Sequence, residues 1–307
     1  DRQEYTPVDD LVHTIEVLRR YVLRPRLARL LGNDQEGLMA ELLAARGIHD
    51  GPRFLAALQR YTELIRTAQV KGRVVRRRSC DELPFELVCH VTYQVYSRIV
   101  APQVEALQQY KAFSNFVYGE INPPLMREMV HEARITRDTV FVDLGCGIGN
   151  VVMYAAAQTG CEAHGVEIMD APARLAQLQA REFLSRMRCY GVPHGNVRIL
   201  HGDFLELPEV AKLLRRADVV LVNNYAFDSQ LNQRLLQLFL DLKEGTRIVS
   251  LRNFVPLDHK ITVRNAGSVE SILRITSHTY PSGSVSWTNS GGQYFVQTVD
   301  RTAVQRF

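Results

Sequence analysis

Residues 139–149 read Thr-Val-Phe-Val-Asp-Leu-Gly-Cys-Gly-Ile-Gly and constrain the fold of this chain more than any other segment. An apolar, β-branched run ends at the acidic Asp143, and glycines follow at alternate positions, Gly145, Gly147 and Gly149. A strand that breaks into glycines and continues as a helix is typical of open α/β sheets where the backbone approaches a nucleotide. Glycine is favoured because a Cβ would obstruct either the left-handed turn or the ligand.

The spacing of these glycines argues against a dinucleotide. A pyrophosphate-binding loop places its third glycine three residues after the second, whereas these glycines alternate. The carboxylate of Asp143 would also repel a phosphate and attract a cation. S-adenosylmethionine carries both an ammonium and a sulfonium, so the segment predicts a methyltransferase. A tight strand-to-helix turn without any ligand is the alternative.

Length and composition allow two domains and argue against several classes of protein. The 307 residues are 46% hydrophobic and 23% charged, and the net charge of +4 is too small to establish a polyanionic partner. Five cysteines without two-residue metal-ligand spacing indicate a reducing compartment and no zinc site. We see no membrane span or secretory leader, and a start at Asp1 instead of methionine leads us to expect further tails.

The first part of the chain, residues 1–115, is predicted to be a helical domain. Apolar residues at helical spacing, with Pro25 as a kink and Asn33-Asp34 as a cap, indicate helices over 11–31, 33–47, 54–70, 85–100 and 104–110.

In residues 116–307 strands and helices alternate. We expect helices over 124–134, 150–158, 172–190, 209–216 and 229–241, and strands over 139–144, 161–167, 196–200, 218–223 and 246–251. Two further runs, 283–288 and 293–298, flank Asn289-Ser290-Gly291-Gly292, which predicts an antiparallel hairpin. The predicted fold is therefore α/β, a class I methyltransferase-like doubly wound and mostly parallel sheet with an antiparallel C-terminal hairpin.

Acidic residues follow the second and third predicted strands of this sheet. Glu167 ends one strand, where a carboxylate can accept hydrogen bonds from both hydroxyls of a ribose. Asp203 and Phe204 follow the next strand and offer an acceptor for the adenine amino group and a face to stack on it. Parallel strands end at one edge of the sheet, so these residues should lie near Asp143. Taken singly, each acid could instead cap a helix or lie in a solvated loop.

The segment Asn223-Asn224-Tyr225-Ala226-Phe227 follows the fourth predicted strand. An asparagine carbonyl can orient an amine and stabilise the positive charge that develops on it, while aromatic rings exclude water. Amine-directed nucleic-acid methylases carry a similar Asn/Asp-Pro-Pro-aromatic loop, but the prolines are absent here. The alternative is a strand-end turn with two core aromatics.

Four motifs occur in a fixed order: Val117-Tyr118-Gly119-Glu120, Asp143–Gly149, Asn223–Phe227 and Gly283-Ser284-Val285-Ser286-Trp287-Thr288. Together they resemble the catalytic region of the disruptor-of-telomeric-silencing histone methyltransferases, the histone lysine methylases without a SET domain. The resemblance covers residues 116–301 and, loosely, 85–96. It implies a nuclear, S-adenosylmethionine-dependent enzyme that methylates a lysine in the folded core of nucleosomal histone H3.

The resemblance also implies roles for individual residues. The cofactor would be held by Tyr118, Gly119, Glu120, Ile121, Phe141, Val142, Asp143, Leu144, Gly145, Cys146, Gly147, Ile148, Gly149, Asn150, Glu167, Asp203 and Phe204. The target lysine would meet the methyl group at Asn223, in a channel lined by Phe227, Trp287 and Tyr294. The chain departs from some or several members of the family at Ile121, Cys146 and Phe295, where those members carry a hydroxyl residue.

No side chain has to act as a general base in this interpretation. The target lysine has an ordinary pKa of ~10.4 and must lose its proton before it attacks. An apolar channel beside a sulfonium would lower that pKa by desolvation and by repulsion between like charges. Water leaving through the channel could then carry the proton away.

A basic segment contains Lys71, Arg73, Arg76, Arg77 and Arg78. It predicts either a solvated linker or a contact to nucleosomal DNA or an acidic histone surface. If it contacts about four phosphates, the log–log salt slope of binding should be roughly −3 to −4.

Two other functions stay open on the residues alone. One is a methyltransferase of RNA or small amines, which would share the fold but lack the channel motifs. The other is a non-catalytic nucleosome- or nucleic-acid-binding module with a vestigial cofactor pocket. The intact Gly145, Gly147, Gly149, Glu167 and Asn223 argue against the module.

Overall fold

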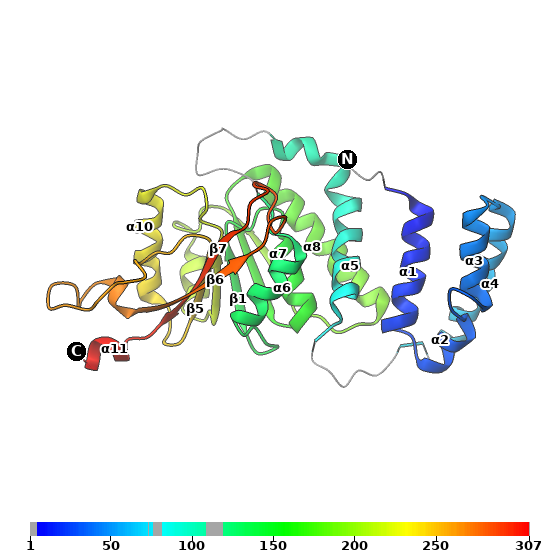
Figure 1. Ribbon diagram of the computed structural model, residues 1–307, viewed down its shortest axis with the longest axis horizontal. Coiled ribbons are helices and arrows are strands. Elements are labelled where there is room, and N and C mark those ends of the chain that lie inside the picture. The colour runs from blue at the N-terminus through cyan, green and yellow to red at the C-terminus, as the bar shows by residue number, and fades with distance from the viewer. Residues whose placement is uncertain (1–4, 73, 76–81, 109–118, 307) are drawn as a thin grey trace.

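The computed structural model describes residues 5–72, 74–75, 82–108 and 119–306 of the chain. Figure 1 shows an elongated molecule with a group of helices at one end and a sheet flanked by helices at the other. No helix among the described residues is long and apolar enough to cross a membrane.

Five α-helices and a 3-10 helix form the N-terminal part. They are α1 (Pro7–Tyr21), α2 (Pro25–Leu31), α3 (Gly37–Gly47), α4 (Gly51–Val70), α5 (Phe85–Ile99) and the 3-10 helix Ala101–Gln108. The prediction of one kinked helix over 11–31 is wrong, because Pro25 begins a new helix. Proline suits the first helical position, where its missing N–H removes no hydrogen bond.

The predicted N-terminus of α3 is also wrong. Oδ1 of Asn33 accepts hydrogen bonds from the backbone N–H groups of Gln35 and Glu36 at 2.8 and 3.1 Å. The Asn33 side chain therefore closes a turn before the helix, which begins at Gly37.

Helix α5 connects the helical group to the sheet. Its buried residues Leu87, Val91 and Val95 belong to the same hydrophobic cluster as residues of α6 (Pro123–Glu132) and α7 (Asn150–Thr159), and its other neighbours include α1. The predicted division near residue 115 falls among residues 109–118, outside the described ones, and stays a prediction.

Seven strands form one mixed sheet in the order β3-β2-β1-β4-β5-β7-β6 (Figure 1). The first five strands along the chain pair in parallel, and β7 pairs antiparallel with both β5 and β6. The bounds are β1 (Val140–Leu144), β2 (Glu162–Glu167), β3 (Val197–His201), β4 (Val219–Val222), β5 (Arg247–Ser250), β6 (Leu273–Tyr280) and β7 (Gly292–Val299). This topology confirms the predicted α/β fold, and the strand order reverses between β1 and β4.

Helices cover both faces of the sheet because its strands are apolar on both sides. On one face, Phe141, Leu221 and Val249 pack with residues of α5, α6, α7 and α8 (Asp170–Tyr190). On the other, Val142 and Val220 pack with residues of α9 (Pro208–Leu214) and α10 (Ser229–Leu238). Short helices Phe239–Asp241, Val269–Ile272 and α11 (Thr302–Arg306) complete the chain.

The C-terminal strands form an antiparallel pair, but its first strand was predicted at the wrong place. The partner of β7 is β6, whereas the predicted strand 283–288 lies in the connection between them. In that connection Val285 forms an isolated antiparallel bridge with Ile121. The backbone N–H of Ser286 donates to the carbonyl of Glu120 at 2.9 Å. The segment therefore pairs with residues upstream of the sheet instead of with β7.

Candidate active site

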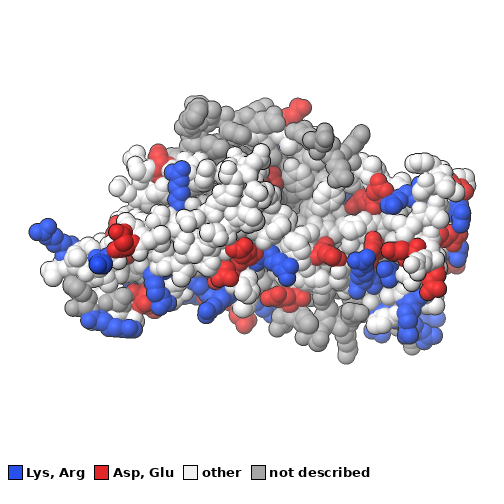
Figure 2. Space-filling model, viewed as in Figure 1, with Lys and Arg blue, Asp and Glu red and all other residues white. Residues whose placement is uncertain are grey.

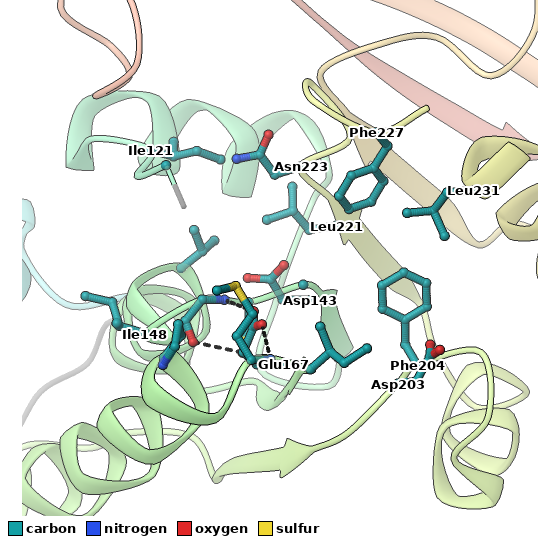
Figure 3. A pocket seen from close by; sticks show the side chains of 18 of the residues that line it. Ile121, Asp143, Ile148, Glu167, Asp203, Phe204, Leu221, Asn223, Phe227 and Leu231 are labelled. Atoms are coloured by element: carbon teal, nitrogen blue, oxygen red, sulfur yellow. Dashed lines mark hydrogen bonds between the residues drawn. The ribbon is translucent and has the colours of Figure 1, made fainter. Parts of the chain in front are cut away.

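A cavity of about 310 Å³ lies at the carboxyl ends of β1, β2 and β4, where the strand order reverses. Ligands of open α/β sheets bind at this point because the loops on either side of the reversal diverge. Figure 3 shows Asp143 in the middle of the cavity, with Asn223 and Phe227 on one side of it and Glu167 on the other. The volume falls in the range of sites for small molecules.

Many of the predicted site residues line this cavity. They are Gly119, Glu120, Ile121, Asp143, Gly145, Cys146, Gly147, Ile148, Asn150, Glu167, Asp203, Phe204, Asn223 and Phe227. Those from Asp143 onward follow successive parallel strands, whereas Gly119, Glu120 and Ile121 precede α6 and reach the cavity from upstream of β1.

The glycine-rich turn adopts the left-handed backbone conformation that its sequence requires. The φ angles are 83° at Gly145 and 55° at Gly147, a region that side chains with a Cβ disfavour. The N–H groups of Gly145 and Cys146 both donate to the carbonyl of Val166, at 2.8 and 3.0 Å. The turn is thus fastened to β2 and holds its own backbone against the cavity.

The two acidic residues at the ends of β1 and β2 are both buried. Burial and the nearby charge of Glu167 raise the pKa of Asp143 to about 8. Burial also raises the pKa of Glu167, and the backbone N–H groups of Gly147 and Met169, each 2.8 Å from a carboxylate oxygen, oppose that shift. Two carboxyl groups beside one cavity favour a cationic ligand, which would relieve the cost of charging Asp143.

Asp203 and Phe204 lie at a further side of the cavity, beyond β3. Oδ1 of Asp203 accepts a hydrogen bond from the backbone N–H of Leu205 at 2.8 Å, so this acid also closes its own turn. Asp203 therefore has the structural role in a loop that was the alternative interpretation, and it also borders the cavity. Phe204 is buried and offers a ring as part of the wall.

Two adjacent asparagines after β4 have different environments. Asn223 is half-buried and lines the cavity. Asn224 is buried, donates to Asn232 Oδ1 and the carbonyl of Arg252 at 3.0 Å each, and accepts from the N–H groups of Leu251 and Arg252. Asn224 therefore fixes the loop that presents Asn223. The resemblance assigned the role at the cavity to Asn223, whereas no sequence signal indicated the structural role of Asn224.

The segment before α6 closes one side of the cavity by pairing with the connection between β6 and β7. The N–H of Glu120 donates to Ser286 Oγ at 2.8 Å, and Asn150 Nδ2 donates to Glu120 Oε2 at 3.0 Å. A Cβ on Gly119 would lie 2.6 Å from Cε3 of Trp287, so the backbone of Gly119 needs the absence of a side chain there. Two distant motifs thus meet at this edge.

Among the described residues, several other predicted site residues do not line the cavity. Tyr294 is fully buried, donates from its hydroxyl to Glu128 at 2.8 Å and stacks on His278 with ring centroids 4.9 Å apart. Trp287 packs against Tyr225, with centroids 5.5 Å apart. Strand and helix-cap residues Phe141, Val142, Leu144 and Gly149 are buried in the fold, and Tyr118 lies outside the described residues.

Sequence reasoning missed several residues of the wall. They are Val151, Ile168, Met169, Pro172, Leu205, Leu221, Asp228, Gln230, Leu231 and Arg234. Most of them directly follow a predicted site residue or begin α10, so the signal was their position at the ends of the same strands. The described residues contain no group of three or more His, Cys, Asp or Glu that could hold a metal ion.

Residues 96–299 match the family model described as "Histone methylation protein DOT1". This chain belongs to that family. The match confirms the family predicted from the four motifs of the DOT1-like region.

Two curated relatives of this DOT1-family chain are named "Histone-lysine N-methyltransferase, H3 lysine-79 specific". The protein from Aspergillus fumigatus is 38% identical over 100% of this chain and 61% of its own length. The protein from Yarrowia lipolytica is 42% identical over 82% of this chain and 51% of its own length. The chain thus spans about half to three-fifths of these relatives.

Proposed function

We propose that this DOT1-family chain uses S-adenosylmethionine to methylate a lysine in the folded core of histone H3 within the nucleosome, and acts in the nucleus. One observation carries the proposal: Asn223 and the buried Asp143 line the same cavity at the reversal of strand order. The family and the names of the relatives, which are H3 lysine-79 specific methyltransferases, support the choice of substrate.

The residues present fit S-adenosylmethionine. Asp143 offers a carboxyl for the cationic part of the ligand, Glu167 offers a carboxylate as an acceptor for the ribose, and Phe204 offers a ring for the adenine. The turn at Gly145 and Gly147 leaves the space that side chains would fill. When bound, this cofactor supplies a methyl group activated by its sulfonium.

The side chains around Asn223 would position the incoming amine and keep water out. The carbonyl of the Asn223 side chain can accept a hydrogen bond from the amine and favour the charge that develops on it. Phe227 and Leu221 supply apolar walls on the same side of the cavity (Figure 3). Desolvation there favours the neutral, nucleophilic form of the lysine, so positioning and exclusion of water would supply most of the acceleration.

Trp287 and Tyr294 do not line the cavity, so we propose that they affect the lysine channel only through the residues they contact. Trp287 stacks near Tyr225, over whose ring the Arg252 guanidinium lies at 5.3 Å. These side chains would support the entrance formed by the Asn223 loop. Tyr294 would act only through its neighbours, because its ring stacks on His278 and its hydroxyl donates to Glu128.

The basic segment would contribute contacts to nucleosomal DNA or to an acidic histone surface. Lys71 is exposed, and Arg73, Arg76, Arg77 and Arg78 lie outside the described residues. Nucleosome binding measured at several salt concentrations tests this part. Replacing the arginines should reduce the log–log slope, and an unchanged slope would remove the segment from the proposal.

Transfer of a radiolabelled methyl group to intact nucleosomes, free histones and RNA tests the function. We expect label on histone H3 of nucleosomes, located to a core lysine by mass spectrometry, and labelling about 100-fold slower with the Asn223→Ala variant. Label on RNA or on small amines would favour the alternative methyltransferase. Calorimetry that detects no binding of S-adenosylmethionine would favour the non-catalytic module.

A further inference from the structure

A second hollow, of about 680 Å³, lies against the antiparallel strands β5, β7 and β6. Arg247 is the first residue of β5, so the hollow opens toward the amino end of that strand. The cavity at Asn223 lies at the opposite, carboxyl edge of the sheet, and the two share no lining residue among those described. The hollow is therefore separate from the candidate active site.

Strand register places two arginines in one row across this hollow. Arg247 of β5 pairs with Thr298 of β7, which pairs in turn with Arg274 of β6. Directly paired residues point to the same face of a sheet, and strands lie about 4.8 Å apart. The two arginines therefore flank the Thr298 hydroxyl on one face, roughly 10 Å apart at their Cα atoms.

A third arginine reaches the hollow from the turn after α6. Arg134 has a φ of 49°, a left-handed conformation that favours glycine at the end of a helix. Its backbone N–H donates to the carbonyl of His131 at 2.9 Å, which closes that turn. An arginine at this position costs about 1 kcal/mol relative to glycine. The preference of the backbone at this position therefore does not explain why residue 134 is an arginine.

The positive charge of these arginines is only partly balanced. Nε of Arg247 is buried without a hydrogen-bond partner among the described residues. Burial and the charge of Arg134 lower the pKa of Arg247, and the charge of Asp218 opposes this shift only in part. Of the nearby carboxylates, Asp300 is 3.9 Å from Arg274, and Glu132 contacts His131 and His278. Figure 2 shows Lys and Arg side chains interspersed with Asp and Glu along the lower margin of the molecule.

We propose that this hollow binds a phosphate-bearing anion between Arg134, Arg247 and Arg274. Guanidinium groups bind phosphate oxygens through paired hydrogen bonds, and the Thr298 hydroxyl adds a donor between two of them. Bound in the hollow, an anion would place negative charge beside the Arg247 guanidinium, whose buried Nε has no hydrogen-bond partner among the described residues. The phosphate could come from a free oligophosphate or from the backbone of a nucleic acid.

Calorimetry of the 307-residue chain with pyrophosphate, and fluorescence anisotropy with duplex DNA, test this site. Arg247→Gln and Arg274→Gln should each weaken binding by about tenfold or more, because each removes a charge-assisted pair of hydrogen bonds. Arg181→Gln, at an exposed position of α8, is the matched control and should bind as the unmodified chain does. The Arg274 side chain is 71% exposed, so its substitution should leave folding intact.

The two ligands separate the two sources of phosphate. Loss of pyrophosphate binding in both variants assigns the site to a free oligophosphate. Loss of DNA binding alone in both variants assigns it to a nucleic-acid backbone. If Arg247→Gln and Arg274→Gln bind both ligands as Arg181→Gln does, or if the unmodified chain binds neither, the proposal is overturned.

Discussion

The backbone N–H of Gly147 donates a hydrogen bond of 2.8 Å to Oε2 of Glu167. This bond joins the glycine-rich turn after β1 to the end of β2. The other oxygen of the carboxylate accepts from the N–H of Met169, so one buried side chain orients two segments of the cavity wall. Glu167 therefore acts on the shape of the cavity as well as on its charge.

Glu167→Gln should weaken binding of S-adenosylmethionine by about 10- to 100-fold. The glutamine NH₂ group would face the N–H of either Gly147 or Met169 and lose one of the two hydrogen bonds. Calorimetry gives the dissociation constant. Glu162→Gln is the control, since Glu162 lies on the same strand, contacts Arg216 at 2.8 Å and is not part of the cavity wall. Equal affinities of the two variants would contradict this role of Glu167.

Asn223→Ala and Asn224→Ala should fail in different ways. The first should lower kcat for methyl transfer by about 100-fold, because the amine loses its orientation, while stability changes by less than about 1 kcal/mol. The second should lower the free energy of unfolding by about 3 kcal/mol, because the backbone N–H groups of Leu251 and Arg252 lose their common acceptor. Single-turnover kinetics and urea unfolding measure these effects, and a stable Asn224→Ala variant would refute the structural role.

The pKa of Asp143 predicts how stability depends on pH. The carboxyl titrates at about 8 in the folded chain and near ~3.9 in the unfolded chain. Folding therefore takes up a proton between these values, and the stability of the ligand-free protein should fall as pH rises from about 4 to 8. Asp143→Asn should remove this loss and be more stable than the unmodified chain at pH 8. Urea unfolding at several pH values measures the free energy of unfolding of both proteins. If this free energy depends on pH in the same way in both, the ionisation of Asp143 does not destabilise the fold.

The same group should make cofactor binding depend on pH. A cationic ligand favours the charged carboxylate, so the affinity for S-adenosylmethionine should rise from pH 6 toward pH 8, where Asp143 ionises without the ligand. Calorimetry in buffers of different ionisation enthalpy should detect release of a proton on binding below pH 8. The Asp143→Asn variant should bind more weakly and lose this pH dependence. A dependence that survives the substitution would have to arise from another group.

Gly119→Ala should impair the cofactor site while the sheet stays folded. A Cβ on Gly119 would approach Cε3 of Trp287 to 2.6 Å and push the segment 119–122 away from its partner, the connection between β6 and β7. We expect roughly tenfold weaker binding of S-adenosylmethionine and a melting temperature within a few degrees of the original. Gly267→Ala is the control, because nothing lies within 4 Å of its Cβ position. Unchanged affinity in Gly119→Ala would show that this segment does not shape the site.

Most of the α/β fold could be predicted because its signals are local. The turn at Gly145 and Gly147 needs left-handed φ angles, and the alternation of apolar strands with helices predicts a mostly parallel sheet. Parallel strands end at one edge of the sheet, so the sequence predicted that four residues at strand ends lie close together: Asp143, Glu167, Asp203 and Asn223. Local turn signals predicted a strand at 283–288, but there Val285 pairs with Ile121 and the expected hairpin does not form.

The sequence by itself determined the order of strands and helices, the glycine turn and the family, because these depend on neighbouring residues and on motifs. Only the tertiary structure decided that Asn224 fixes the loop beside Asn223 and that Tyr294 points to Glu128. It also placed Arg247 and Arg274 on either side of Thr298. Each of these outcomes depends on the register of distant strands or on hydrogen bonds across long sequence separations, which no local pattern encodes.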